Sequence, residues 1–164
     1  MAEHFHVRIA KEELVFSAAH FITFAGDICE RLHGHNYRLA AEVSGPLDEN
    51  AYVIDFIALR DELRAIVATL DHFVLLPTGH GRIHVEANDR EVVATFEDRR
   101  WVFPRGDCVL LPVPNTTAEM LAHYIGGQLL AALRTRLAWS PEWLRIEVDE
   151  CQGQLGICEW NPPA

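Results

Sequence analysis

The chain has 164 residues, of which 49% are apolar and 23% are charged, proportions typical of a globular protein with a substantial core. The formal net charge is −10, and Lys11 is the one lysine among 14 basic residues. A nucleic-acid surface is excluded because phosphate binding needs concentrated positive charge. We therefore treat 1–164 as a single domain without a nucleic-acid partner.

The sequence shows no targeting or membrane-spanning segment. Its beginning, MAEHFHVRIAKEELVF, has neither the charged and then apolar order of a signal peptide nor a run approaching about 20 apolar residues. The four cysteines, at positions 29, 108, 151 and 158, form no CxxC pair and are too sparse for a disulfide framework. We expect a cytoplasmic protein with reduced thiols and no membrane partner.

The first half of the chain predicts two strands and a helix. The strands lie near residues 5–20 and 35–45, and the loop between them, ITFAGDICERL, brings Cys29 close to the second strand. A helix is predicted from Asp55 because apolar residues recur there at helical spacing, with charged residues on the other side. These apolar positions are Phe56, Leu59, Leu63, Ile66, Val67 and Leu70.

The second half predicts an insertion, a second helix and two more strands. Residues 82–104 contain short β-rich runs separated by turn-like groups, which indicates an inserted β-hairpin segment at about 79–111. Thr116 and Glu119 have capping-box spacing before a helical pattern in 115–137. Strands follow near 143–150 and 155–160, so the order of elements predicts an α+β fold.

His20, His33 and His35 form a candidate metal site. Residues two apart in a strand share a face, so His33 and His35 point the same way, and His20 shares its face with Phe16 and Ala18. Three imidazoles from neighbouring strands match a zinc site with an open fourth position. The alternative is that they are ordinary hydrogen-bonded histidines.

Cys29, Asp71 and His72 are candidates for proton transfer. Asp71 and His72 lie at a helix end between apolar residues, where a carboxylate could orient an imidazole. A thiolate near a metal could act as a base and pass its proton to that pair. The alternatives are a small buried cysteine and a histidine that interacts with the helix dipole.

Glu150 is a candidate binding residue because strand alternation places it on the apolar face of RIEVDE with Ile146 and Val148. An unpaired carboxylate there is costly. A ligand with two adjacent NH donors, such as the edge of a pterin or guanine, would satisfy both oxygens. A salt bridge to an arginine is the alternative.

The segments FSAAH, CERLHGHNY, VIDF, LDH, NTTAE and IEVDE, in this order, resemble the 6-pyruvoyltetrahydropterin synthase family, which includes 6-carboxytetrahydropterin synthases. The resemblance spans nearly the whole chain except for about 79–111. It implies the tunnelling fold (T-fold), with a four-stranded antiparallel sheet, two helices on one face, and assembly into a homohexamer with active sites between subunits.

The resemblance also implies roles for individual residues. His20, His33 and His35 correspond to zinc ligands, Cys29 to the catalytic cysteine, and Asp71 and His72 to the proton relay. Glu150 corresponds to the pterin anchor, which could serve a pocket whose zinc belongs to another copy. Thr116 and Thr117 match a segment that helps to hold the pterin ring.

The substrate that the resemblance implies is 7,8-dihydroneopterin triphosphate. The spacing between Cys29 and His33 resembles that of the branch that makes 6-carboxytetrahydropterin and acetaldehyde, as in queuosine biosynthesis. Elimination of triphosphate to 6-pyruvoyltetrahydropterin is the alternative product, and a non-catalytic pterin-binding protein of the same fold is a further one. Cys151, where the family commonly has threonine, departs from the pattern.

Overall fold

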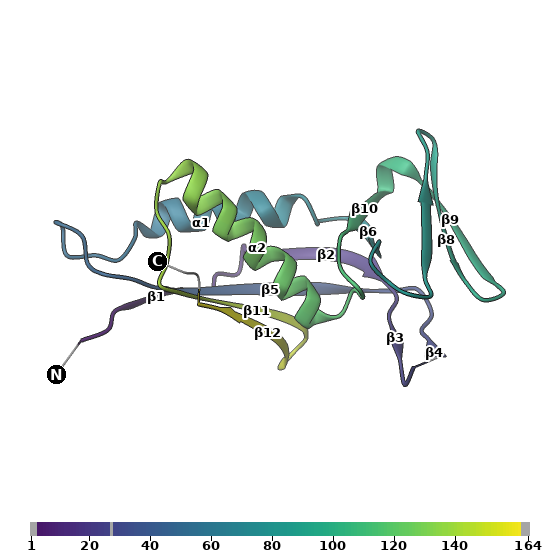
Figure 1. Ribbon diagram of the computed structural model, residues 1–164, viewed down its shortest axis with the longest axis horizontal. Helices are drawn as coiled ribbons and strands as arrows, with labels where there is room; N and C mark the ends of the chain where they lie inside the picture. Colours follow the sequence, from purple (N-terminus) through teal and green to yellow (C-terminus); the bar gives the residue numbers. More distant parts are fainter. Residues whose placement is uncertain (1–2, 27, 162–164) are drawn as a thin grey trace.

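A computed structural model describes residues 3–26 and 28–161 and shows one main sheet with two helices on the same side (Figure 1). The sheet order is β10-β6-β2-β5-β11-β12, and β1 pairs with a further part of β5. Its strands are β1 His6–Ile9, β2 Val15–His20, β5 His33–Ser44, β6 Phe73–Pro77, β10 Cys108–Leu111, β11 Trp143–Cys151 and β12 Gln154–Trp160. The α+β prediction and the placement of both helices on one face are confirmed.

Over the described residues, the main sheet has seven strands in place of the four that were predicted. The expected antiparallel strands are present as β2, β5, β11 and β12. The predicted strand at 5–20 is divided by a turn in which the amide of Leu14 donates to the carbonyl of Lys11, so β1 and β2 pair with different parts of β5. At the other edge, β6 pairs in parallel with both β2 and β10, and the sheet is therefore mixed.

Helix α1, Phe56–Ala68, begins where the sequence predicts it. Asp55 is its N-cap, because the carboxylate accepts from the amides of Ile57 and Ala58. The predicted apolar positions are buried, except that Phe56 is 59% exposed. Phe56 is the first helical residue and projects beyond the sheet-facing stripe, so periodicity alone assigned it to the core wrongly.

Helix α2, Ala118–Arg136, begins one residue later than the capping-box spacing indicates. Thr117 is the N-cap and accepts from the amide of Met120, so the pairing of Thr116 with Glu119 is not formed. Leu121, Ile125 and Leu129 pack into the main core. The helix therefore covers β11 and β12 with the apolar face that the sequence predicted.

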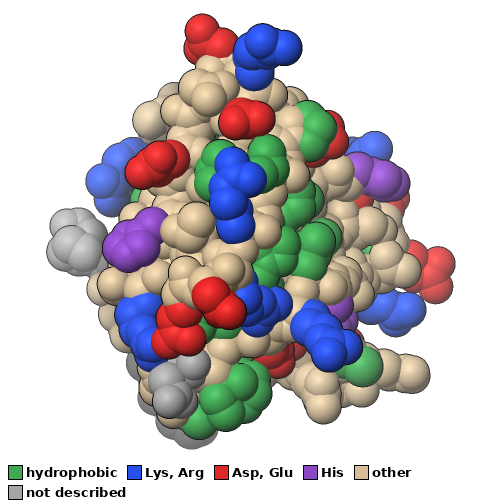
Figure 2. All heavy atoms as spheres, turned by 90° about the vertical axis from the view of Figure 1, so that its right-hand side faces the viewer, with side chains coloured by type: hydrophobic (Ala, Val, Ile, Leu, Met, Phe, Trp, Pro, Cys, Tyr) green, Lys and Arg blue, Asp and Glu red, His purple; other side chains and the backbone are tan. Residues whose placement is uncertain are grey.

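The segment between β6 and β10 forms a separate antiparallel sheet at one end of the molecule (Figure 1). Its strands are β7 His84–Ala87, β8 Glu91–Phe96 and β9 Arg99–Pro104, followed by the short 3-10 helix η1 Arg105–Asp107. Two further short strands, β3 Thr23–Phe24 and β4 Ile28–Cys29, form the ribbon before β5. Figure 2 views this end, where basic and acidic side chains are interspersed around apolar ones.

None of the helices in the described part of the chain is long and apolar enough to cross a membrane. The four cysteines are free, as the sequence predicted.

Gly126 and Gly127 provide a matched pair that tests the packing of α2. A Cβ on Gly126 would lie 2.1 Å from the Trp160 ring, whereas a Cβ on Gly127 would meet nothing within 4 Å. We expect Gly126→Ala to lower the free energy of unfolding by about 1–3 kcal/mol through overpacking. Gly127→Ala should raise it by up to about 1 kcal/mol through helix propensity. Urea denaturation of both variants measures the two effects, and equal effects would contradict the packing described here.

Candidate metal and substrate site

The pairing of β2 with β5 brings the three predicted metal ligands together. His20 lies opposite His33, and Ala18 lies opposite His35, in the antiparallel register. The three ring centroids lie 4.7–5.3 Å apart. One ring nitrogen from each histidine lies within 4.8 Å of the other two. The sequence prediction that these imidazoles converge is confirmed.

Hydrogen bonds leave one ring nitrogen of each imidazole facing the centre of the cluster. Nδ1 of His20 donates to the carbonyl of Thr116 at 2.8 Å, and Nδ1 of His33 donates to the carbonyl of Arg31 at 2.8 Å. A carbonyl can only accept, so both Nε2 atoms carry lone pairs. The buried Nε2 of His35 has no hydrogen-bond partner among the described residues. Such a set of donors fits a divalent metal ion.

The environment of His20 favours the neutral imidazole that a metal requires. Burial lowers the pKa of His20 to about 4, the Thr116 carbonyl opposes this shift, and the nearby His33 and His35 lower the pKa further. The side chain is 1% exposed. His20 is thus ready to bind a metal without first losing a proton at neutral pH.

Glu150 lies beside the cluster of its own chain. Its Oε1 is 3.3 Å from Nε2 of His20 and 3.8 Å from Nε2 of His35. A register shift between Asp149 and Cys151 interrupts the pairing with β12 at this point. No arginine of the described chain lies within 4.0 Å of its carboxylate, so the alternative of a salt bridge to arginine is not supported.

Tyr37 is a site residue that sequence analysis missed. Its hydroxyl is 3.0 Å from Nε2 of His20 and donates to Oε1 of Glu150 at 3.3 Å. Burial, and then the charge of Glu150, raise the pKa of Tyr37, which keeps the hydroxyl protonated. The signal was available, because Tyr37 lies two residues after His35 and therefore on the same strand face.

Cys29 lies in β4, before β5, and is not a member of the histidine cluster. Its Sγ is 3.6 Å from the carbonyl oxygen of Glu30. Burial raises the pKa of the Cys29 thiol, Arg99 opposes this, and Glu30 and Glu97 add to it. The surrounding protein therefore does not by itself produce the ionised thiol that the sequence analysis expected.

The carboxylate of Glu30 is the nearest acidic group to His33. Its Oε2 lies 3.8 Å from Nε2 of His33, and both side chains are partly exposed. Sequence analysis overlooked Glu30 because it follows the more conspicuous Cys29. Its position makes it a second candidate base at this end of β5.

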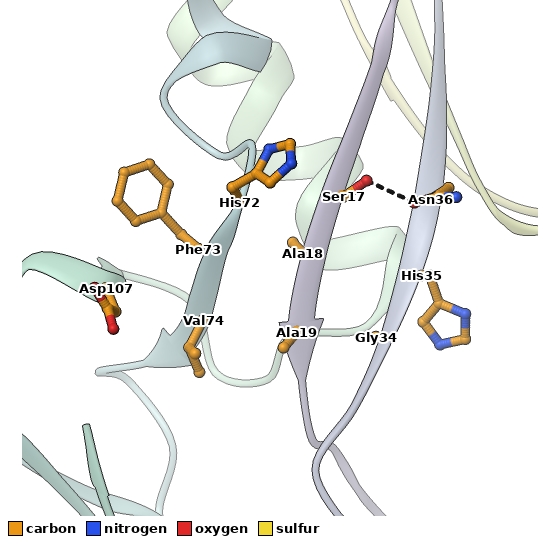
Figure 3. Close-up of a pocket in the computed structure, with 10 residues that line it drawn as sticks. All are labelled: Ser17, Ala18, Ala19, Gly34, His35, Asn36, His72, Phe73, Val74 and Asp107. Atoms are coloured by element: carbon orange, nitrogen blue, oxygen red, sulfur yellow. Dashed lines mark hydrogen bonds between the residues drawn. The ribbon is translucent and has the colours of Figure 1, made fainter. Parts of the chain in front are cut away.

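Asp71 and His72 form the predicted pair, at a distance from the histidine cluster. Asp71 accepts from the amide of Ser17 at 2.7 Å and from Nδ1 of His72 at 2.9 Å. The Ser17 amide, together with His72, holds the pKa of Asp71 below its ordinary value despite partial desolvation. His72 is 81% exposed and adjoins an open hollow of about 510 Å³. In Figure 3, the His35 ring points away from His72, on the far side of β2 and β5.

Thr116 and Thr117 connect α2 to the site through bonds within the chain. Thr116 is fully buried, and its hydroxyl donates to the carbonyl of Phe21 at 3.2 Å. The carbonyl of Thr116 accepts the hydrogen bond from Nδ1 of His20, and the hydroxyl of Thr117 caps α2. Both side-chain oxygens are therefore already engaged in holding this segment in place.

The sequence profile of 6-pyruvoyl tetrahydropterin synthase matches residues 8–159. The chain belongs to this family. A Methanocaldococcus jannaschii member, provisionally named 6-carboxy-5,6,7,8-tetrahydropterin synthase, is 32% identical over 88% of each chain. A Haemophilus influenzae 6-carboxy-5,6,7,8-tetrahydropterin synthase is 33% identical over 72% of this chain and 79% of its own.

Solved structures of the family support the same conclusion. A Plasmodium vivax 6-pyruvoyltetrahydropterin synthase, described as a variant in which a catalytic glutamate is replaced by alanine, superposes with a TM-score of 0.89 at 28% identity. The superposition covers 98% of this chain and 100% of the other. Both the profile match and this superposition run through residues 79–111. The T-fold that the sequence analysis expected is confirmed.

Loss of one histidine should prevent metal binding. We expect His33→Ala to lower the affinity for an added divalent ion such as Zn²⁺ at least about 100-fold, because two imidazoles cannot replace three. The metal retained after desalting measures this effect. His84→Ala is the matched control, because His84 is an exposed histidine of β7 outside the cluster. Equal metal content in the two variants would contradict the assignment.

Proposed function

We propose that the protein is a zinc-dependent lyase that converts 7,8-dihydroneopterin triphosphate, with water, to 6-carboxy-5,6,7,8-tetrahydropterin, acetaldehyde and triphosphate. The observation that carries the proposal is the cluster of His20, His33 and His35 beside Glu150. Membership of the family supports a lyase acting on a pterin. The names of the M. jannaschii and H. influenzae relatives favour the carboxy product, and the resemblance to the carboxy branch implies a role in queuosine biosynthesis.

Zinc is the proposed ion because three neutral imidazoles with room for a further ligand are typical of catalytic zinc sites. Bound there, Zn²⁺ would lower the pKa of substrate hydroxyls and polarise a carbonyl oxygen. The carbonyls of Thr116 and Arg31 orient His20 and His33 for this task, as bonds to the outer ring nitrogen do in metal sites.

Glu150 is the proposed anchor of the pterin ring. Its carboxylate would accept from the 2-amino group and the neighbouring ring NH, two donors in the geometry that a carboxylate matches. Tyr37 holds one of its oxygens at 3.3 Å. Thr116 and Thr117 have engaged hydroxyls, so we assign them to the wall of the pocket through the backbone of this segment.

Cys29 is the proposed base, and Asp71 with His72 the proposed relay. Because the exposed His72 lies apart from the histidine cluster of its own chain, we propose that it completes the pocket of a neighbouring copy. This arrangement agrees with the homohexamer, a dimer of trimers, that the resemblance implies. We place the assembly in the cytoplasm.

Two observations favour variations on this mechanism. The structural relatives with 28–29% identity are named 6-pyruvoyltetrahydropterin synthases, so triphosphate elimination without carbon–carbon cleavage is the second candidate reaction. The P. vivax variant concerns a catalytic glutamate, and Glu30 lies beside His33 in this chain. Glu30 is therefore a second candidate base.

Product analysis tests the reaction. The zinc-loaded protein is incubated with 7,8-dihydroneopterin triphosphate, and the products are identified by mass spectrometry. We expect 6-carboxytetrahydropterin and an equal amount of acetaldehyde. A pyruvoyl product without acetaldehyde would support the second reaction, and unconsumed substrate would leave only a pterin-binding role.

The two candidate bases can be distinguished by substitution. Cys29→Ala should retain zinc and bind the pterin but lose turnover by a factor of about 100 or more, because general base catalysis contributes on that scale. Glu30→Gln should lose less than about tenfold if Cys29 is the base. Turnover near the wild-type rate in Cys29→Ala, together with a severe loss in Glu30→Gln, would assign the role to Glu30.

A further inference from the structure

The inserted sheet, β7–β9, is connected at several points to the segment before β5 that contains Cys29. Nε2 of His80, in the turn before β7, is 2.7 Å from the hydroxyl of Thr23. Nδ1 of the same ring accepts from the amides of Arg82 and Ile83, so Nε2 must carry the proton and donate to Thr23. His80 therefore links the segment that precedes β7 to β3 by a hydrogen bond.

Two arginines of this region donate to backbone carbonyls of the same segment. Arg82 donates to the carbonyl of Gly26 at 2.9 Å and forms an ion pair with Glu97. Arg99, the first residue of β9, donates to the carbonyl of Cys29 at 2.6 Å. Charged donors make the stronger hydrogen bonds in proteins, so these contacts restrain the backbone at two separate points.

Apolar packing reinforces these contacts. Trp101 of β9 stacks on Phe21 at 4.3 Å, and the guanidinium of Arg99 lies 4.6 Å above the Trp101 ring. Phe21 is fully buried in a second hydrophobic core, against which Cys29 packs. The other buried members of this core are Leu76, Ile83, Val92, Ala94, Phe96 and Cys108.

We propose that the inserted sheet positions the Cys29 segment, residues 21–26 and 28–30, and that Arg99 is the positioning residue for Cys29 itself. The catalytic meaning of this inference rests on the proposed role of Cys29. The short ribbon of β3 and β4 has two residues in each strand, which is too little to hold its own geometry. The segment before α2 holds one side of this ribbon, where Asn115 donates to the carbonyl of Thr23 and Thr116 to that of Phe21. The restraint nearest Cys29 comes from β9, and a further one comes from the turn that contains His80.

Arg99 also places a positive charge near the Cys29 thiol, because its guanidinium bonds to the carbonyl of the same residue. Among the residues that the structure describes, Arg99 favours the Cys29 thiolate, whereas Glu30 and Glu97 disfavour it. Removing Arg99 would leave two carboxylates and burial, all of which raise the thiol pKa. The position of the Cys29 backbone and the pKa of the Cys29 thiol thus both depend on the Arg99 side chain.

Hydrogen exchange tests the positioning. Arg100 is the matched control, because it is the next residue of β9, has the same charge, is exposed and makes no side-chain hydrogen bond with a described residue. In Arg99→Ala we expect amides of residues 21–26 and 28–30, including Glu30, which donates to Ile22, to exchange at least about fivefold faster. Exchange in β5 and α2 should be unchanged, and Arg100→Ala should match the wild type throughout.

Alkylation of Cys29 tests the charge. The rate is followed against pH by mass spectrometry of the Cys29 peptide, with the exposed Cys151 as an internal reference. We expect Arg99→Ala to move the midpoint for Cys29 to higher pH and to leave that for Cys151 unchanged. With substrate, kcat should fall about tenfold and KM should change less than twofold, because Arg99 does not touch the anchor Glu150.

The outcomes separate this inference from the proposed function. Exchange and alkylation need no substrate, so they remain decisive even if the protein proves not to be a lyase. Exchange in Arg99→Ala equal to that in Arg100→Ala would overturn the positioning, and an unmoved midpoint would overturn the electrostatic role. If Arg99→Ala fails to fold, Arg82→Ala removes the contact with Gly26, and unchanged exchange near that residue would overturn the inference equally.

Discussion

The antiparallel register of β2 against β5 is the constraint on which the site depends. With His20 opposite His33, all three imidazoles lie on the face that also buries Phe16 and Tyr37. A slip of one residue would move one strand's histidines to the other face of the sheet and dissolve the cluster. Because Phe16 and Tyr37 are fully buried and stacked at 4.8 Å, the core opposes such a slip. Hydrophobic packing thus fixes the geometry of a polar site.

The neighbouring elements add to this framework in different ways. The β11 strand delivers Glu150 at the irregularity where its pairing with β12 shifts. The N-terminal end of α2 delivers the Thr116 carbonyl that orients His20. Arg99 of the β7–β9 sheet donates to the carbonyl of Cys29. Residues far apart in the sequence therefore reach one region because each lies at the end of a regular element.

The sequence predicted those features that depend on local periodicity. The shared face of His33 and His35, the apolar stripes of both helices and the inward position of Glu150 follow from periods of 2 and 3.6 residues. Other features depend on tertiary contacts that no local pattern contains. The parallel strands β6 and β10 are short apolar runs without a distinctive period, and the N-cap of α2 is Thr117 because Thr116 bonds to Phe21. The distance of His72 from the cluster likewise reflects the pairing of β6 with β2 on the side away from β5.

The bridge formed by Tyr37 has a thermodynamic consequence. Its hydroxyl contacts the imidazole of His20 and the carboxylate of Glu150, which themselves lie only 3.3 Å apart. A cation held by the histidines would attract that carboxylate, and a ligand held by the carboxylate would change the field at the cation. Binding of a cation to the histidines and binding of a ligand to Glu150 would therefore be energetically coupled. By linkage, the cation would change the affinity for the ligand by the same factor as the ligand changes the affinity for the cation.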